Sequence, residues 1–159
     1  MRRHPLLLFF FIAILALPVP AQPDPGQAME RLENELFAWV NHERGLRGLP
    51  ALRSDPRLRV LARAHSRKMV QESRLDHEFP GYPKLSVRAA QAGLRFSRIG
   101  ENLAVGDTAV MHHVHEQMLA SPGHCDNTLD RHFTHMGIGI LKKGNRYFIT
   151  QEFAHLQAP

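Results

Sequence analysis

Cysteine is nearly absent from this chain of 159 residues, which contains Cys125 alone. One cysteine cannot form a disulfide within the chain, so the fold must be stabilised by its hydrophobic core. A chain of this length buries about two-thirds of its unfolded surface, which is enough for one core and predicts a single domain. We interpret Cys125 as a small buried hydrophobe. Two alternatives stay open: an exposed thiol that links two chains into a dimer, and a nucleophile beside His124.

Blocks of one charge sign are also lacking. The formal net charge is +5, yet the arginines and lysines are scattered among acidic residues. The chain has no basic run interleaved with aromatic residues, the pattern typical of nucleic-acid binding, so nucleic acid is not an expected partner. Internal repeats and low-complexity tracts are absent too, which excludes repeat architectures.

Long hydrophobic runs are limited to one segment, residues 6–17, which follows Arg2 and Arg3. It is shorter than the roughly 20 residues of a membrane-spanning helix, and Val19-Pro20-Ala21 after it resembles a signal-peptide cleavage site. We therefore predict a cleaved signal peptide over residues 1–21, a mature chain without a membrane span, and a secreted or periplasmic location. An uncleaved N-terminal anchor is the alternative. Cleavage lowers the formal charge from +5 to +3, because Arg2 and Arg3 are removed.

Hydrophobic periodicity predicts helices in the first two-thirds of the chain. We expect a linker over residues 22–30, a domain over 31–156, and a first helix that ends near Arg44. Ser54-Asp55-Pro56 provides an N-cap and a proline at the first helical position of a second helix. Further predicted elements are a loop over 76–83, a short helix over 84–92, a helix capped by Asp107 or Thr108, and a helical turn opened by Ser121 and Pro122.

After Phe133 the hydrophobic period changes from 3.6 to 2. Met136, Ile138 and Ile140 alternate with glycines, residues 142–145 resemble a turn, and alternation resumes over 147–153. This pattern predicts a C-terminal β-hairpin. A two-stranded ribbon is stable only when helices cover it, so helices followed by a hairpin indicate an α+β fold.

The chain has eleven histidines, so some of them are expected to cluster by chance. For each histidine a structural role is therefore considered before a functional one. His112, His113 and His115 resemble a ligand patch, but adjacent residues point to different sides of a helix, and we interpret them as a polar face. His77, Glu101 and His124 stand out because each lies at a break in the predicted secondary structure. Gly100 permits a close backbone approach before Glu101, and Asn102 can fix loop backbone there.

Five motifs occur in order between residues 32 and 154, and together they resemble the bacterial CAP superfamily (SCP or pathogenesis-related-1-like proteins). The motifs are Asn41–Arg44, Gly100–Ala104, Ser121–His124 with Asn127, Phe133–Gly139 and Tyr147–Phe153.

The resemblance implies a three-layer α-β-α sandwich with a central cleft. In that cleft two histidines and one or two glutamates converge and, in some members, bind a divalent cation such as zinc. His77, Glu101 and His124 match three of these positions, and imidazole and carboxylate are natural zinc ligands. Without metal, a histidine beside a glutamate has a raised pKa and can act as an acid or base. The alternative is that the three residues only hydrogen-bond one another and hold loops in place.

The sequence departs from the superfamily pattern at three positions. Met118 stands near the position of a tryptophan, Ser121 near that of a second glutamate, and Cys125 where bacterial relatives often have arginine. Glu116 is the nearby candidate for the missing carboxylate. Asn41 and Arg44, at the end of the first helix, are predicted to be structural.

Two functions follow as expectations. The first is an extracytoplasmic binding module for a lipid, glycan or peptide, whose cleft binds a divalent metal. The alternative is a metal-dependent, peptidase-like hydrolase that uses His77, Glu101 and His124 as its catalytic and zinc-binding residues. Ser121 is better explained as a helix cap than as a nucleophile, and no aspartate is spaced to orient a histidine behind it. The sequence leaves open whether the protein is an enzyme.

Overall fold

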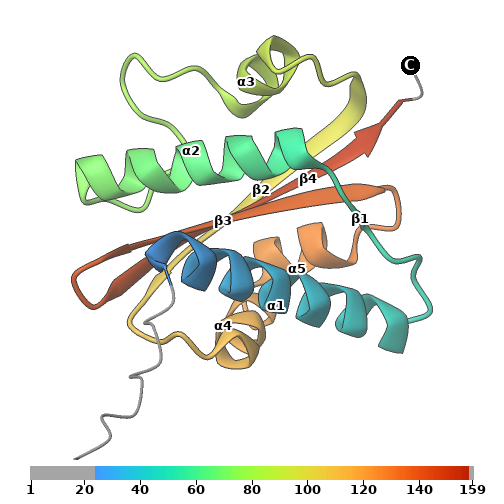
Figure 1. Cartoon of the computed structure of the whole chain (residues 1–159). Coiled ribbons are helices and arrows are strands. Elements are labelled where there is room, and N and C mark those ends of the chain that lie inside the picture. The colour runs from blue at the N-terminus through green and yellow to red at the C-terminus, as the bar shows by residue number, and fades with distance from the viewer. Residues whose placement is uncertain (1–23, 158–159) are drawn as a thin grey trace, which may run out of the picture.

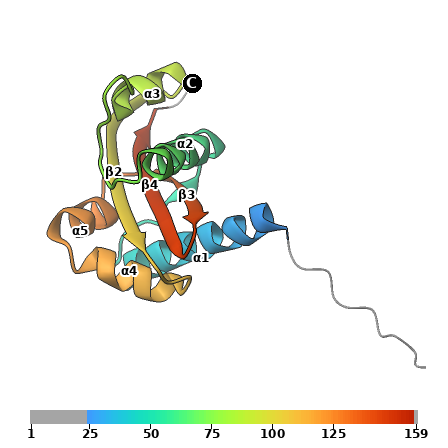
Figure 2. The ribbon, with the colours of Figure 1, turned by 90° about the vertical axis from the view of Figure 1, so that its left-hand side faces the viewer.

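The computed structural model describes residues 24–157, so the predicted signal peptide lies outside the described residues. A sheet forms the middle layer, with α2 and α3 on one face and α1, α4 and α5 on the other (Figure 1). This arrangement confirms the predicted three-layer α-β-α sandwich, which Figure 2 shows end-on. The elements are α1 (Pro25–Leu46), β1 (Arg53–Ser54), α2 (Pro56–Glu72), α3 (Leu85–Gln91), β2 (Phe96–Gly106), α4 (Met111–Leu119), α5 (Pro122–Leu129), β3 (His135–Lys143) and β4 (Arg146–Leu156).

The sheet has the strand order β1-β3-β4-β2. Strands β3 and β4 form the predicted hairpin, and β1 adds a short parallel edge to β3. Strand β2 pairs antiparallel with β4 along its length, so the segment 100–104 lies within a strand and not in the expected loop. Glycine, glutamate and asparagine are poor strand formers, and pairing with β4 overrides their local preference.

Two helix boundaries differ from the prediction. Helix α1 begins at Pro25, which fits the preference of proline for the first helical turn, so most of the expected linker is helical. Helix α4 begins at Met111 with Val110 as its N-cap, and the predicted cap Thr108 instead accepts a hydrogen bond from the Val110 amide. The start of α2 is confirmed, because Asp55 caps its first turn.

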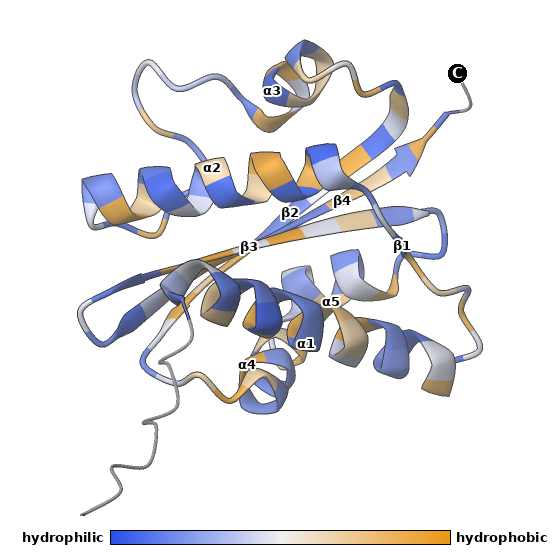
Figure 3. Cartoon of the chain, in the orientation of Figure 1, coloured by the Kyte–Doolittle hydropathy of each residue, from blue (hydrophilic) through white to orange (hydrophobic). Residues whose placement is uncertain are grey.

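Buried apolar residues form core clusters on both faces of the sheet, one with residues of α1 and α4 and one with residues of α2 and α3. Figure 3 marks the hydrophobic residues along these helices and strands. Strand β3 packs closely against α2, and its two central glycines make this approach possible. A Cβ on Gly137 would lie 2.2 Å from the backbone nitrogen of Arg59, and one on Gly139 equally close to that of Arg63. The glycine alternation in the predicted hairpin is therefore a packing requirement of the helix above it.

Arg44 joins α1 to the segments around it. The side chain is fully buried, and Asn41 one turn earlier hydrogen-bonds both backbone groups of Leu52. The predicted structural role of both residues is confirmed, although Arg44 binds carbonyl groups and not a carboxylate. It donates to three backbone carbonyl oxygens, those of Pro50, Thr128 and Asp130, and so fixes the end of α5 against α1.

Candidate functional site

Glu101 is at the centre of the predicted site. It lies on β2 directly opposite Glu152 of β4, and its side chain is only 5% exposed. One carboxylate oxygen is 2.9 Å from Nδ1 of His77, and the other accepts a 3.0 Å hydrogen bond from Nη2 of Arg88. The structure thus places two of the three predicted residues, His77 and Glu101, in contact. His77, on the loop before α3, remains 58% exposed.

Arg88 bridges two buried carboxyl groups. Its Nη1 lies 3.3 Å from Oε1 of Glu152, and its guanidinium stacks 5.0 Å from the ring centre of Tyr82. One arginine cannot neutralise two buried carboxylates at once. Burial, together with the negative charge of Glu101, raises the pKa of Glu152 well above its usual value. Burial thus favours the protonated form of Glu152, whose second oxygen, Oε2, has no hydrogen-bond partner among residues 24–157.

The charges around Glu101 set its own ionisation. Burial acts to raise its pKa, but the hydrogen bond from His77 and the charges of His65 and Arg88 outweigh it and lower the pKa. In turn, the hydrogen bond to Glu101 outweighs burial and raises the pKa of His77. The pair is therefore an ionised carboxylate that favours a protonated, solvent-exposed imidazole.

His65 supports this pair from beneath. It lies fully buried on α2, with Nε2 3.0 Å from the carbonyl oxygen of Asp76, the residue before His77. Its Nδ1 is 3.6 Å from a Glu101 oxygen. Burial lowers the pKa of His65 although the charge of Glu101 acts in the opposite direction. Through its contact with Asp76 the ring acts as a positioning group for the loop of His77.

His124, the third predicted residue, is in the first turn of α5. Its backbone carbonyl accepts a 3.0 Å hydrogen bond from Asn102 of β2, so the side chain of Asn102 holds α5 against the sheet. Gly100 allows α5 to lie this close to β2, because a Cβ at position 100 would lie 2.9 Å from Oδ1 of Asn127 on α5. Burial, and then the charge of His77, lower the pKa of His124. Its Nδ1 is buried and has no hydrogen-bond partner among residues 24–157.

A hollow of about 230 Å³ lies beside His124. It runs along β2 towards α4, and most of its wall is apolar. Its polar members are Gln117, Ser121 and His124, and its apolar members include Leu75, Leu103, Val105, Val114, Met118 and Ile149. The hollow can accept an apolar group whose polar end meets His124.

Neither candidate nucleophile is activated. Ser121 is the N-cap of α5, as predicted, although its hydroxyl makes no capping hydrogen bond. Cys125 is only half-buried, which differs from the expected buried position, and its thiol is free. Within the described part of the chain, neither side chain hydrogen-bonds a histidine, so no Ser–His or Cys–His pair is present.

The donors left for a metal in the cleft are ring nitrogens. Both Glu101 oxygens and Nδ1 of His77 already have partners, which leaves Nε2 of His77 and the ring nitrogens of His124. His77, Glu101 and His124 do not form a group whose ligand atoms all lie within 4.8 Å of one another. Among residues 24–157 that arrangement occurs at His112, His113 and Glu116.

The histidine patch on α4 differs from its predicted composition. His115 is 3% exposed and packs inside, where burial and then the charge of His112 lower its pKa to about 4. Glu116 lies beside His112 instead, with its carboxylate 3.5 Å from Nε2 of that ring. The candidate fourth carboxylate of the cleft is therefore engaged elsewhere, on the exposed surface of α4.

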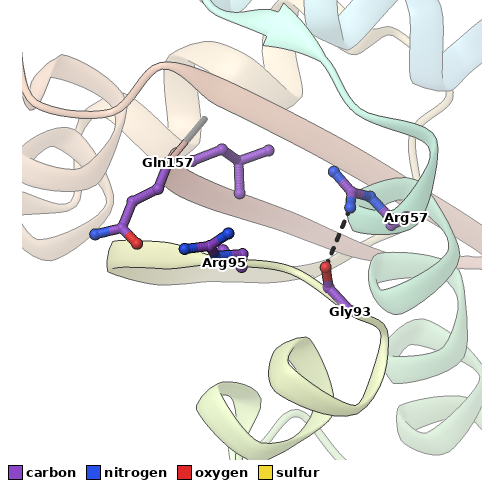
Figure 4. A pocket seen from close by; sticks show the side chains of 5 residues that line it. Arg57, Gly93, Arg95 and Gln157 are labelled. Carbon is purple, nitrogen blue, oxygen red and sulfur yellow. Dashed lines mark hydrogen bonds between the residues drawn. The ribbon is translucent and has the colours of Figure 1, made fainter. Parts of the chain in front are cut away.

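A second hollow, of about 310 Å³, lies near the C-terminal end of β4 (Figure 4). Arg57 and Arg95 line it, and the Arg57 guanidinium donates to the carbonyl of Gly93 and pairs with Asp55. None of the predicted site residues line this hollow.

Four residues at the site were not among the predicted ones: His65, Tyr82, Arg88 and Glu152. Glu152 lies within the last of the five motifs, and His65 is on the apolar face of a predicted helix, where a histidine is unusual. Arg88 and Tyr82 gave no signal, because their contacts with Glu152 and with each other depend on the packing of the 79–91 segment over the sheet.

A family model described as the cysteine-rich secretory protein family, CAP, matches residues 37–153. The chain belongs to this family. It is 32% identical over 121 residues to YkwD, an uncharacterized protein of Bacillus subtilis; the match covers 76% of this chain and 46% of YkwD. The CAP chain therefore spans less than half the length of that relative.

Solved structures agree on the fold. An extracellular SCP-domain protein of Bacillus anthracis superposes with a TM-score of 0.74 at 26% identity, covering 84% of this chain and 44% of that protein. An outer surface protein of Borrelia burgdorferi superposes with a TM-score of 0.75 at 20% identity, covering 81% and 96%. In the part of the CAP chain that the structure describes, no helix has the length and apolar character needed to cross a membrane.

Proposed function

We propose that this CAP protein is a binding module that holds the apolar part of a lipid or peptide in the hollow beside His124. The observation that supports this most is a mostly apolar hollow whose wall has only a few polar residues, His124, Gln117 and Ser121. Such convergence of apolar walls and a few polar groups is typical of ligand sites.

The size of the hollow limits the ligand. At about 230 Å³ it is smaller than the roughly 300–1,000 Å³ of pockets that enclose a drug-sized molecule. It suits a short acyl chain or one aliphatic side chain, with the rest of the ligand outside. A glycan fits less well, since its hydroxyl groups would face apolar walls at a desolvation cost.

Ala104→Phe tests this function, because Ala104 lines the hollow and the new ring would fill it. Titration calorimetry with a medium-chain fatty acid and with a short peptide of aliphatic residues should show binding to the wild type that A104F abolishes. Val60→Phe is the control, since Val60 is 65% exposed on α2 and touches no part of the hollow. Equal binding by A104F and the wild type would contradict the proposal.

The cleft is also proposed to bind a divalent cation, with zinc as the first candidate. His77 and His124 would provide the ring nitrogens, and Glu101 would orient His77 through Nδ1, as carboxylates commonly orient metal-binding histidines. Zinc calorimetry on the wild type, His77→Ala and His124→Ala tests this. Loss of the same binding event in both variants supports a shared site. Unchanged zinc binding in both would contradict it and leave these histidines structural.

A metal-dependent hydrolase remains the second candidate, and one observation favours it. His77 is exposed, and Glu101 is bonded to its Nδ1, so Nε2 is left to ligate a metal ion that would activate water. Turnover of cell-wall peptides or casein that disappears with a chelator and in His77→Ala would establish hydrolysis. A binding module would show no turnover to lose.

We further propose that the protein acts outside the cytoplasm after cleavage behind Ala21. The basic start, the apolar segment over 6–17 and the small residues at 19–21 support export. N-terminal sequencing of the protein from the periplasm or medium should begin at Gln22. Recovery of the intact chain from the membrane fraction would indicate the anchor instead.

A further inference from the structure

The contact between α1 and α4 places several aromatic rings together on the surface. His112 of α4 stacks on Trp39 of α1, with ring centres 4.3 Å apart and planes 35° apart. The edge of His42 meets the same indole at 5.6 Å. Because the indole contacts His112 on one face, that imidazole is held in a defined orientation before any ligand binds.

Three potential ligands converge next to this stack. The ligand atoms of His112, His113 and Glu116 all lie within 4.8 Å of one another. His112 and Glu116 are one helical turn apart, with Nε2 and a carboxylate oxygen separated by 3.5 Å. His113 and Glu116 are exposed, and the His112 side chain is 44% exposed, so an ion can reach the group from solvent.

The donor types select a class of ion. Two imidazoles and one carboxylate suit Zn²⁺ and Cu²⁺, whereas Ca²⁺ and Mg²⁺ prefer sites made of oxygen alone. Stacking on Trp39 reduces the freedom that His112 would lose on binding, which favours affinity. Three protein ligands leave one or more positions for water or for a donor from another molecule.

We propose that His112, His113 and Glu116 form a surface site for a first-row divalent metal ion, Zn²⁺ or Cu²⁺, which we call the α4 metal site. It is distinct from the cleft, because neither His77, Glu101 nor His124 belongs to it. The proposal does not depend on the function proposed for the cleft.

Trp39 makes the α4 metal site directly observable, because it is the only tryptophan in the chain. Copper bound at His112 would lie against the indole and quench its fluorescence, while copper bound in the cleft would have no such contact. We expect titration of the purified protein with CuCl₂ to give saturable quenching with one ion per chain. Competition by ZnCl₂ should shift the copper titration to higher concentration.

His113→Ala is the most informative variant, since His113 is exposed and does not stack on Trp39. It should leave the emission spectrum and melting temperature unchanged and weaken the quenching constant by at least about tenfold, the lower limit known for losing even an indirect metal partner. Glu116→Gln should weaken it in the same direction. The double variant His112→Ala with His113→Ala should abolish saturable quenching.

Two control variants separate this site from other histidines. His132→Ala removes another exposed histidine that pairs with a carboxylate, 2.8 Å from Asp130, and His77→Ala alters the cleft. Both should quench like the wild type. No saturable quenching in the wild type, quenching unchanged in the double variant, or equal weakening by His132→Ala would each overturn the proposal.

Discussion

Replacement of Glu152 by glutamine should make the protein more stable near neutral pH, although it removes one member of an ion pair. In the structure Glu152 is fully buried beside Glu101, and its pKa is raised well above the usual 4.5. A glutamine has the shape of the protonated acid: its amide can donate towards Glu101 while its carbonyl accepts from Arg88. The substitution therefore keeps the hydrogen bonds and removes the ionisable group.

The sign and size of the effect follow from proton linkage. A carboxyl group whose pKa is higher in the folded than in the unfolded state makes its full contribution to stability below the unfolded pKa. That contribution is lost as the pH rises from about 4.5 through the folded pKa. Within that window one proton corresponds to about 1.4 kcal/mol per pH unit. The free energy of unfolding of the wild type should fall relative to that of Glu152→Gln with this slope, and the difference should be constant above the folded pKa.

Urea unfolding at half-unit steps from pH 4.5 to 7.5 measures this difference. Glu72→Gln is the control. The hydrogen bond from Lys68 lowers the pKa of Glu72, so the titration of Glu72 affects stability only below pH 4.5, outside the measured range. A Glu152→Gln variant that is destabilised by the same amount at every pH would refute the reasoning. It would show that Glu152 is ionised in the fold and is the true ion-pair partner of Arg88.

Three further predictions concern the packing of β3, the buried Arg44 and the thiol of Cys125. Gly137→Ala should cost about 1–3 kcal/mol in urea unfolding, because its Cβ would lie 2.2 Å from the nitrogen of Arg59, whereas Gly45→Ala, which meets nothing within 4 Å, should cost nothing. Arg44→Met should destabilise by about 3 kcal/mol or more, since three backbone carbonyl groups lose a charged donor that is itself buried; a thermal melt within a degree of the wild type would contradict this. A dimer through Cys125 should appear on a non-reducing gel after oxidation and vanish in Cys125→Ser; a purely monomeric oxidised sample would count against it.

Local periodicity predicted the helices and the hairpin, whereas the three-layer arrangement was implied by the family resemblance. Met136, Ile138 and Ile140 alternate with glycines, and all five residues from 136 to 140 are buried, because α2 packs directly on the glycines. Strand β2 could not be found in this way. Its burial does not alternate cleanly, since Gly100, Glu101 and Asn102 occupy its centre, and its pairing partner β4 lies about fifty residues further along the chain.

The site was predictable only in part for a related reason. His77, Glu101 and His124 are found by their motifs, and the contact between the first two is present. Arg88 occupies one oxygen of Glu101 and so changes the role expected for Glu101. The sequence around Arg88 gives no indication of this contact with a residue 13 positions away. The three histidines of α4 were expected to form a polar helix face, but the packing of α4 on α1 turns His115 inward and leaves Glu116 beside His112.

The charge balance around Glu101 bears on whether the cleft hydrolyses or only binds. A general base needs a carboxylate with a free oxygen and a pKa near the working pH. Glu101 has neither, because His77 and Arg88 occupy its two oxygens and its pKa is lowered. Glu152 has a raised pKa but is fully buried, out of reach of a substrate. Hydrolysis in this cleft would thus require a metal at His77 and His124 to activate water, so activity that persists after complete chelation would contradict the assignment of Glu101 as a positioning group.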